Sequence, residues 1–297
     1  MMRKYLAVVL FTSVLLSCGC TKKGTHSTEA KNEMQSIVST KQSAAIYAIP
    51  DAIASYYSEV NFNQDQASLQ ADLTHLTRAK HTHRLSYGGL WEVLKVTDLT
   101  PAANEVYLLY GQKGVLKGEN AYARGKNQHG GRQHQWNREH TYARSLGTPK
   151  LGQSSTGANE DAHHIRPADV QWNAQRGNKK FAQGSGAAGD VPGGWYPGDE
   201  WKGDVARMML YMYIRYPDQC LPKNVALGQP NKNDANMINL LLEWNATDPV
   251  STIEIQRNEY LSKPDIQGNR NPFIDNPHLA TLLWGGPEAE NKWNIAN

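Results

Sequence analysis

Glu139, His140 and Asn173 are residue types that together suit phosphodiester hydrolysis. That reaction needs positive charge beside a dianionic transition state, a base that deprotonates water, and stabilisation of the leaving alkoxide. A hard cation such as Mg²⁺ supplies the charge and prefers oxygen ligands, which Glu139 and the amide of Asn173 provide. The imidazole of His140 titrates near neutral pH, so it is suited to be the general base.

A short helix is needed to position part of this set. The sequence predicts a helix over 167–176, because a proline opens this segment and Gly177 follows it. On such a helix Asp169, Asn173 and Arg176 are spaced four and three residues apart, so they share one face. That face offers an amide to a metal ion and a guanidinium to a phosphate, in a bidentate fork.

The segment before this helix supplies Glu139 and His140, and it is expected to be extended. Adjacent residues of a strand point to opposite faces. Both side chains therefore serve one site only where the strand ends or bends, and the sequence alone does not show that bend.

The other predicted elements are mainly helical. Helices are predicted where apolar residues recur at helical spacing, around 69–76 and 90–94. Helices are also predicted over 204–216, 234–244 and 251–261. The apolar and aromatic segment 105–110 predicts a short strand, whereas 111–133, rich in Gly, Asn, Gln and Arg, is predicted to be a loop. The fold class is therefore α+β, a single mainly helical domain with few short strands.

Composition is that of a globular protein with a core of its own. Of the 297 residues, 39% are hydrophobic and 20% are charged, and no repeat or second linker interrupts the segment 45–290, which we assign to one domain. The formal net charge of +3 is too small to identify a partner. Positive charge is nevertheless concentrated in 121–180, which holds ten Lys and Arg against four Asp and Glu.

The N-terminal segment 1–18 is predicted to be a bacterial lipoprotein signal peptide. Two basic residues precede an apolar segment over 5–16 that is too short to span a bilayer. The residues LLSC before and at Cys18 resemble a lipobox, so Cys18 is the expected lipidation site. Cys20 is a weaker alternative, and an ordinary cleaved signal peptide is another. Each alternative takes the protein out of the cytoplasm.

A polar tether over 19–44 is expected between the membrane and the domain, because this segment lacks aromatic residues. With Cys18 lipidated, only Cys20 and Cys220 remain. Their number excludes a cysteine-based zinc site and a framework of disulfides, so packing must stabilise the domain.

Several segments, taken in order, resemble the bacterial endonuclease I family of extracytoplasmic nucleases. The central ones are NREH at 137–140 with the Ser-Leu-Gly turn after it, DAHHIRPAD at 161–169 and VQWNAQRGN at 170–178. The resemblance continues in Gln256-Arg257-Asn258, in QGNRNPFID at 267–275, and in Ser86-Tyr87, Leu90-Trp91 and Thr97-Asp98. It thus extends over most of the chain, from about residue 50 to 280.

This resemblance implies a ββα-metal, or His-Me finger, core. It implies His140 as general base and Glu139 and Asn173 as ligands of one divalent metal, Mg²⁺ first, with Mn²⁺ or Ca²⁺ as alternatives. Arg144 is expected to contact the scissile phosphate, and His163 to orient the site together with Asp169. His164 stands where the family often has asparagine, so its role stays open. The several disulfides of some members are missing here.

The expected function is therefore that of a metal-dependent endonuclease with little sequence specificity. Double-stranded DNA is the first expected substrate, with single strands or RNA as alternatives, contacted through the phosphate backbone by a monomer. A metallopeptidase or amidase of the cell envelope is one alternative, but such enzymes usually hold zinc with three protein ligands, and HExxH is missing. The other alternative is an inactive surface lipoprotein that binds nucleic acid. The presence of Glu139 and His140, which are the residue types that the reaction requires, argues against it.

Overall fold

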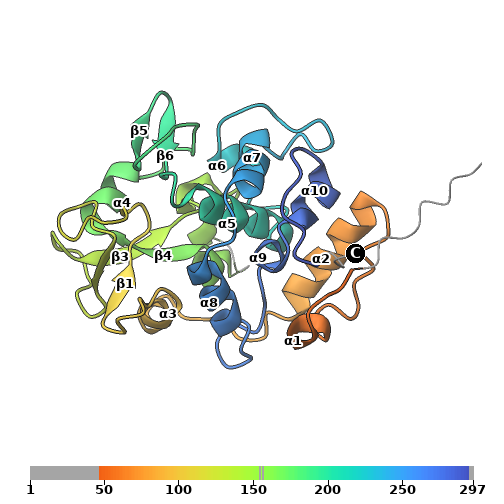
Figure 1. Cartoon of the computed structure of the whole chain (residues 1–297), viewed down its shortest axis with the longest axis horizontal. Helices are drawn as coiled ribbons and strands as arrows, with labels where there is room; N and C mark the ends of the chain where they lie inside the picture. Colours follow the sequence, from red (N-terminus) through yellow and green to blue (C-terminus); the bar gives the residue numbers. More distant parts are fainter. Residues whose placement is uncertain (1–46, 154, 156, 294–297) are drawn as a thin grey trace, which may run out of the picture. The chain divides into compact units, whose positions relative to one another are not determined.

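The computed structural model describes residues 47–153, 155 and 157–293, which belong to one compact unit (Figure 1). The predicted lipidation site Cys18, the signal peptide and the tether lie outside these residues. No helix in the described part of the chain is both long and apolar enough to cross a membrane.

Helices dominate the described residues, and the strands among them are short, which confirms the predicted α+β class. The α-helices are α1 (Asp51–Ala54), α2 (Gln66–Ala79), α3 (Leu90–Thr97), α4 (Val170–Arg176), α5 (Lys202–Arg215), α6 (Pro222–Val225), α7 (Asn239–Thr247), α8 (Thr252–Leu261), α9 (Pro272–Asp275) and α10 (His278–Trp284). The strands are β1 (Glu105–Tyr107), β2 (Ala123–Gly125), β3 (Trp136–His140), β4 (Ile165–Asp169), β5 (Gly189–Val191) and β6 (Gly194–Tyr196). Four short 3₁₀ turns precede β4, namely η1 (Arg144–Leu146), η2 (Leu151–Gln153), η3 (Ala158–Glu160) and η4 (Ala162–His164).

Helix α5 is the centre of the core. Every residue after Lys202 in this helix is buried, and α5 packs against α2, α6, α7 and α9 (Figure 1). The helix ends just before Pro217, as its composition predicts, since proline cannot continue it. A helix that is apolar on nearly all sides is expected to lie inside a protein rather than on its surface.

Strands β3 and β4 form the antiparallel pair that positions the candidate site. Trp136 pairs with Asp169 at one end of this hairpin, and His140 pairs with Ile165 at the other. Helix α4 begins directly after β4 and packs on both strands (Figure 1). The sequence β3, β4, α4 is thus a ββα unit.

The predicted helix over 167–176 is wrong in its first part, which is strand β4. Pro167 fits a strand here because it needs no N–H partner, and its carbonyl accepts a hydrogen bond from Leu109 N at 2.8 Å. Asp169 is the N-cap of α4, where its side chain accepts from the backbone N–H groups of Gln171 and Trp172 at 2.7 and 3.2 Å. Gly177 ends the helix with a φ of 54°, as predicted.

Other predicted boundaries also differ, and the strand predicted over 105–110 ends at Tyr107. The predicted loop 111–133 contains strand β2, which pairs with β1. The predicted helix over 234–244 begins only at Asn239, because the side chain of Asp234 accepts from Asn236 N at 2.9 Å and holds a turn instead. Helix α8 starts as expected, and Ser251 forms a capping box with Glu254.

Buried ion pairs hold β4 against the helices. Arg166 donates to Asp98 at 2.5 Å and to Asp204 of α5 at 3.0 Å, and all three side chains are at most 2% exposed. Because a buried charge without a partner is strongly destabilising, these contacts fix the position of the ββα unit relative to α5.

Candidate active site

His140 is the last residue of β3, and one of its ring nitrogens is anchored. Nε2 lies 2.9 Å from the backbone carbonyl oxygen of Asn159. Since a carbonyl only accepts, Nε2 carries the proton and Nδ1 has a free lone pair. Nδ1 takes part in no hydrogen bond among the described residues. This tautomer is the one that a general base requires.

Burial keeps this imidazole neutral. His140 is 8% exposed, and burial together with the nearby His164 ring lowers its pKa to about 3. The rings of His140 and His164 have their centroids 5.5 Å apart. The imidazole is therefore neutral at every pH well above that value, and its pKa lies below the near-neutral value expected from the sequence.

A stack of side chains covers the His140 ring. Tyr87 lies against it with 5.8 Å between ring centroids and 24° between ring planes. The guanidinium of Arg138 covers Tyr87 at 3.6 Å from the ring centroid and also contacts Trp91 at 4.1 Å. Arg138 additionally donates to the backbone carbonyl of Tyr87. Arg138 and His140 are two residues apart on β3, so they share a face and hold Tyr87 between them.

Two imidazoles fix the turn η3 that anchors the base. His140 donates to Asn159, and His164 donates through Nε2 to the carbonyl of Ala158 at 2.8 Å. Gly157 precedes the turn with a φ of 87°, a conformation that favours glycine. The role of His164, which the sequence leaves open, is therefore to hold the turn.

Glu139 points toward α4 and Tyr110, whereas His140 makes its contacts with η3 and Tyr87. Oε1 accepts a hydrogen bond from Tyr110 at 2.9 Å and one from Arg176 at 3.0 Å. Oε2 takes part in neither bond. The carboxyl is 2% exposed, and burial raises its pKa while Arg176 opposes that shift.

Asn173 lies on the same side, one turn before Arg176. Its Nδ2 donates to Oδ1 of Asn137 at 2.7 Å, and Asn137 is two residues before Glu139 on β3. Asn173 Oδ1 forms no hydrogen bond among the described residues. The oxygens that remain available on Asn173 and Glu139 suit a hard divalent cation. No cluster of three His, Cys, Asp or Glu side chains suited to a metal occurs in the described ranges.

The prediction that Arg176 contacts a phosphate at the surface is wrong. The side chain is fully buried, and its guanidinium donates to Glu139, to the carbonyl of His140 at 3.0 Å and to the carbonyl of Thr141 at 2.8 Å. A phosphate cannot reach a guanidinium in this position. Arg176 instead ties α4 to the end of β3.

Arg144 is exposed in η1 and lies near enough to His140 for its charge to contribute to the lowered pKa of the imidazole. An exposed guanidinium beside the base can reach a bound anion. The predicted contact of Arg144 with a phosphate therefore stays a prediction.

His163 and Asp169 lie behind the site. His163 is 3% exposed, its Nε2 is 3.1 Å from the carbonyl of Asn269, and its ring packs on Tyr211. Asp169 pairs with Arg124 at 2.5 Å besides capping α4. Both support the fold around the hairpin, and in the described structure neither side chain forms a hydrogen bond or ion pair with Glu139, His140 or Asn173.

Besides Tyr87 and Arg138, three further contributors were not predicted as site residues from the sequence, namely Asn159, Tyr110 and Asn137. The carbonyl of Asn159 is a main-chain atom, so residue type gives no sign of it. Tyr110 is an aromatic residue of an apolar segment and looks like core. Asn137 belongs to the same NREH segment as the base, and its spacing of two from Glu139 on a strand is a pattern that points to it.

The ββα unit carries an imidazole with one anchored and one free nitrogen together with carboxylate and amide oxygens, which are groups that suit hydrolysis of a phosphodiester. The sequence profile of the endonuclease I family matches residues 65–278, and the chain belongs to this family. It is 40% identical over 242 residues to an extracellular ribonuclease of Bacillus amyloliquefaciens, covering 77% of this chain and 78% of the relative. It is also 40% identical over 262 residues to an extracellular ribonuclease of Bacillus subtilis (strain 168), covering 84% of each.

Proposed function

We propose that this protein is an exported, metal-dependent endonuclease that hydrolyses nucleic acids with His140 as its general base. The observation that carries the proposal is the hydrogen bond from His140 Nε2 to the carbonyl of Asn159 at 2.9 Å. It leaves Nδ1 as the one basic ring nitrogen, and burial keeps it unprotonated.

In the proposed reaction His140 Nδ1 takes the proton of the attacking water. The ring becomes an imidazolium, whose Nε2–H stays bound to the Asn159 carbonyl, and this contact stabilises the new charge. Glu139 Oε2 and Asn173 Oδ1 would hold a divalent cation, Mg²⁺ first, which supplies positive charge to the phosphate and to the leaving oxygen. Arg144 would contact the phosphate from the solvent side.

Both RNA and DNA are proposed substrates. The two relatives are named ribonucleases, which favours RNA. Attack by water activated at His140, however, does not require the ribose 2′-hydroxyl, so a chain without that group should also be cleaved. Contacts to phosphates carry no sequence information by themselves, and little base specificity is expected.

Export is proposed on two grounds. Both relatives are named extracellular, and the N-terminal segment has the pattern of a signal peptide. Lipidation at Cys18 would keep the enzyme on the membrane surface. Labelling with a radioactive fatty acid should mark the wild-type chain and leave Cys18→Ser unmarked.

The test of the activity is cleavage of supercoiled plasmid and of RNA by the purified chain with Mg²⁺, with excess EDTA, and with His140→Ala. We expect the chain to cleave both polymers, and we expect EDTA and His140→Ala each to abolish this cleavage. The control variant Gln175→Ala, which changes an exposed residue of α4, should keep full activity. RNA with 2′-O-methyl groups should still be cut. If the RNA products instead carry 2′,3′-cyclic phosphate ends and DNA is not cut, the nucleophile is the 2′-hydroxyl and not water.

A further inference from the structure

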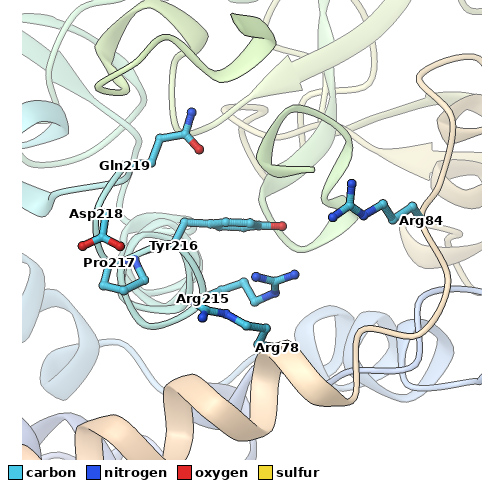
Figure 2. A pocket seen from close by; sticks show the side chains of 7 residues that line it. All are labelled: Arg78, Arg84, Arg215, Tyr216, Pro217, Asp218 and Gln219. Atoms are coloured by element: carbon cyan, nitrogen blue, oxygen red, sulfur yellow. The ribbon is translucent and has the colours of Figure 1, made fainter. Parts of the chain in front are cut away.

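A pocket with three arginines lies between the ends of α2 and α5. It has a volume of about 230 Å³ and is lined by Arg78, Arg84, Arg215, Tyr216, Pro217, Asp218 and Gln219 (Figure 2). Arg78 comes from the last turn of α2 and Arg215 is the last residue of α5, while Arg84 approaches from the opposite side. None of these residues belongs to the candidate active site.

The three guanidinium groups have little negative charge to balance them. Arg78, Arg84 and Arg215 form no ion pair within the described part of the chain. Arg215 is only 7% exposed, and its Nε is buried without a hydrogen-bond partner among the described residues. Its Nη2 lies 3.4 Å from Nδ1 of His81, which is a neutral partner because burial lowers the pKa of that imidazole. Arg215 also lies over the Tyr216 ring at 4.4 Å, but no carboxylate of the described residues forms an ion pair with it, so the pocket leaves a place for an anion.

The carboxylates nearby balance this charge only in part. The charge of Arg215 helps to lower the pKa of Asp161, and Glu160 lines a neighbouring hollow with Arg84. Asp218 is exposed and lies across the pocket from Arg84 (Figure 2). Asp161, behind the pocket, is fully buried and already accepts from Tyr211 at 2.7 Å and from Tyr216 at 2.9 Å. Three positive charges therefore face one exposed negative charge in the pocket.

We infer that this arginine pocket binds a phosphate group of the nucleic-acid chain at a distance from the bond that is cleaved. Arginine forks match phosphate oxygens in a bidentate way, and the pocket is several times larger than the about 30 Å³ that one water occupies in the liquid. This inference rests on the proposed function, since it assigns a second contact to the same substrate.

The position of the pocket favours a phosphate of the polymer over a free ion. Gln219 donates to the carbonyl of Pro149 at 2.8 Å, and Arg84 donates to the carbonyl of Ser155 at 2.9 Å. The pocket thus borders the segment between η1 and η3, whose far end carries Asn159 and anchors His140. A polymer bound at the base can cross this segment and reach the arginines.

Space beyond the arginines is also available. A more open hollow of about 540 Å³ shares Arg78 and Pro217 with the pocket and is lined further by Ala67, Gln70, Ala71, Thr74 and His75 of α2. Its size leaves room for a sugar and base next to the bound phosphate.

Binding to the His140→Ala chain tests the inference, because this variant keeps its substrate intact. In that background Arg78→Ala and Arg84→Ala each remove an exposed arginine of the pocket, and Lys232→Ala removes an exposed positive charge elsewhere. Affinity for a long polynucleotide, measured by fluorescence anisotropy, should fall about tenfold with either arginine change, and the salt slope of log Kd should fall by about one. Affinity for a trinucleotide should fall less, and Lys232→Ala should change neither value.

A test with inorganic phosphate distinguishes a phosphate of the polymer from a free phosphate ion as the anion in the pocket. Saturating phosphate should raise the Tm of the parent chain but not that of Arg78→Ala. A Tm effect without any loss of polynucleotide affinity would show a site for a free ion and overturn the inference, as would the absence of both effects. A wild-type chain that binds polynucleotide through Arg78 but cuts nothing would refute the proposed function and leave the inference standing.

Discussion

Arg176 donates a hydrogen bond at 3.0 Å to Oε1 of Glu139 from a guanidinium that is fully buried. The same group donates to the main-chain carbonyls of His140 and Thr141. One side chain of α4 therefore fixes both the proposed metal ligand and the backbone of the proposed base. This contact makes the ββα unit rigid where the chemistry is proposed to occur.

We expect Arg176→Ala to lower the free energy of unfolding by about 3–5 kcal/mol, because it leaves the buried Glu139 carboxylate without its charged partner. Arg176→Lys keeps the charge but loses the fork, so it should lose less. Urea denaturation measures both. Arg132→Ala removes an exposed arginine and should change stability by at most about 0.5 kcal/mol. Equal losses in all three variants would contradict this role of Arg176.

Glu139→Gln and Asn173→Ala should weaken metal binding. Glu139→Gln removes the negative charge of one proposed ligand and Asn173→Ala removes the oxygen of the other, so the Mg²⁺ concentration that gives half-maximal cleavage should rise at least about tenfold. Titration of activity with Mg²⁺ measures this value. Gln175→Ala, on the same helix but exposed, provides the control. An unchanged Mg²⁺ requirement in both variants would exclude these two side chains as ligands.

Tyr87→Leu should reduce kcat by about tenfold or more, because the His140 ring loses the aromatic face that holds it in place. The acid limb of the pH profile of kcat/KM should also move to higher pH, since water then reaches the ring and its pKa rises toward 6.5. Tyr87→Phe keeps the ring and should restore both quantities. A lower rate with an unchanged pH profile would indicate a general loss of structure.

Three buried histidines make stability depend on pH. Burial lowers the pKa of His140 to about 3 and that of His163 and His164 to about 4, whereas each imidazole has a pKa of about 6.5 when unfolded. Below pH 6.5 the unfolded chain therefore binds more protons, and the free energy of unfolding falls as the pH drops toward 4. The raised pKa of Glu139 acts in the opposite direction.

The size of this effect is testable by denaturation with urea at several pH values. Each of the three histidines contributes a slope of up to about 1.4 kcal/mol per pH unit between its two pKa values. His164→Asn removes one contribution and should flatten the curve. His134→Asn, at an exposed position, should leave the curve as it is. Stability that stays constant from pH 7 to pH 5 would show that these rings do not remain neutral.

The sequence predicted the fold class correctly, because the helices that dominate it depend on local patterns. Helices α2, α3, α5 and α8 follow from apolar spacing and capping residues. Strand β4 was missed because Pro167 is a favourable helix start, and only the pairing with β3 and the contact with Leu109 show why it is extended. Such pairing depends on residues distant in sequence.

The burial of arginines was the other feature that the sequence could not show. Arginine is usually exposed, so Arg176 was expected to face a phosphate. Its partner Glu139 is 37 residues away in the sequence, and Arg166 finds Asp98 across 68 residues. Only the folded chain brings these charges together and decides which arginines remain free for an anion.

The carbonyl that orients His140 has a consequence for how this enzyme can vary. In a triad built from three side chains, a mutation of the third residue removes the group that holds the base. Here every amino acid that could replace Asn159 still carries a carbonyl, so a point mutation at this position leaves the supporting atom in place. The vulnerable feature is the path of the main chain, which Gly157 helps to set. A shifted loop is expected to abolish activity even with all of the proposed catalytic side chains present.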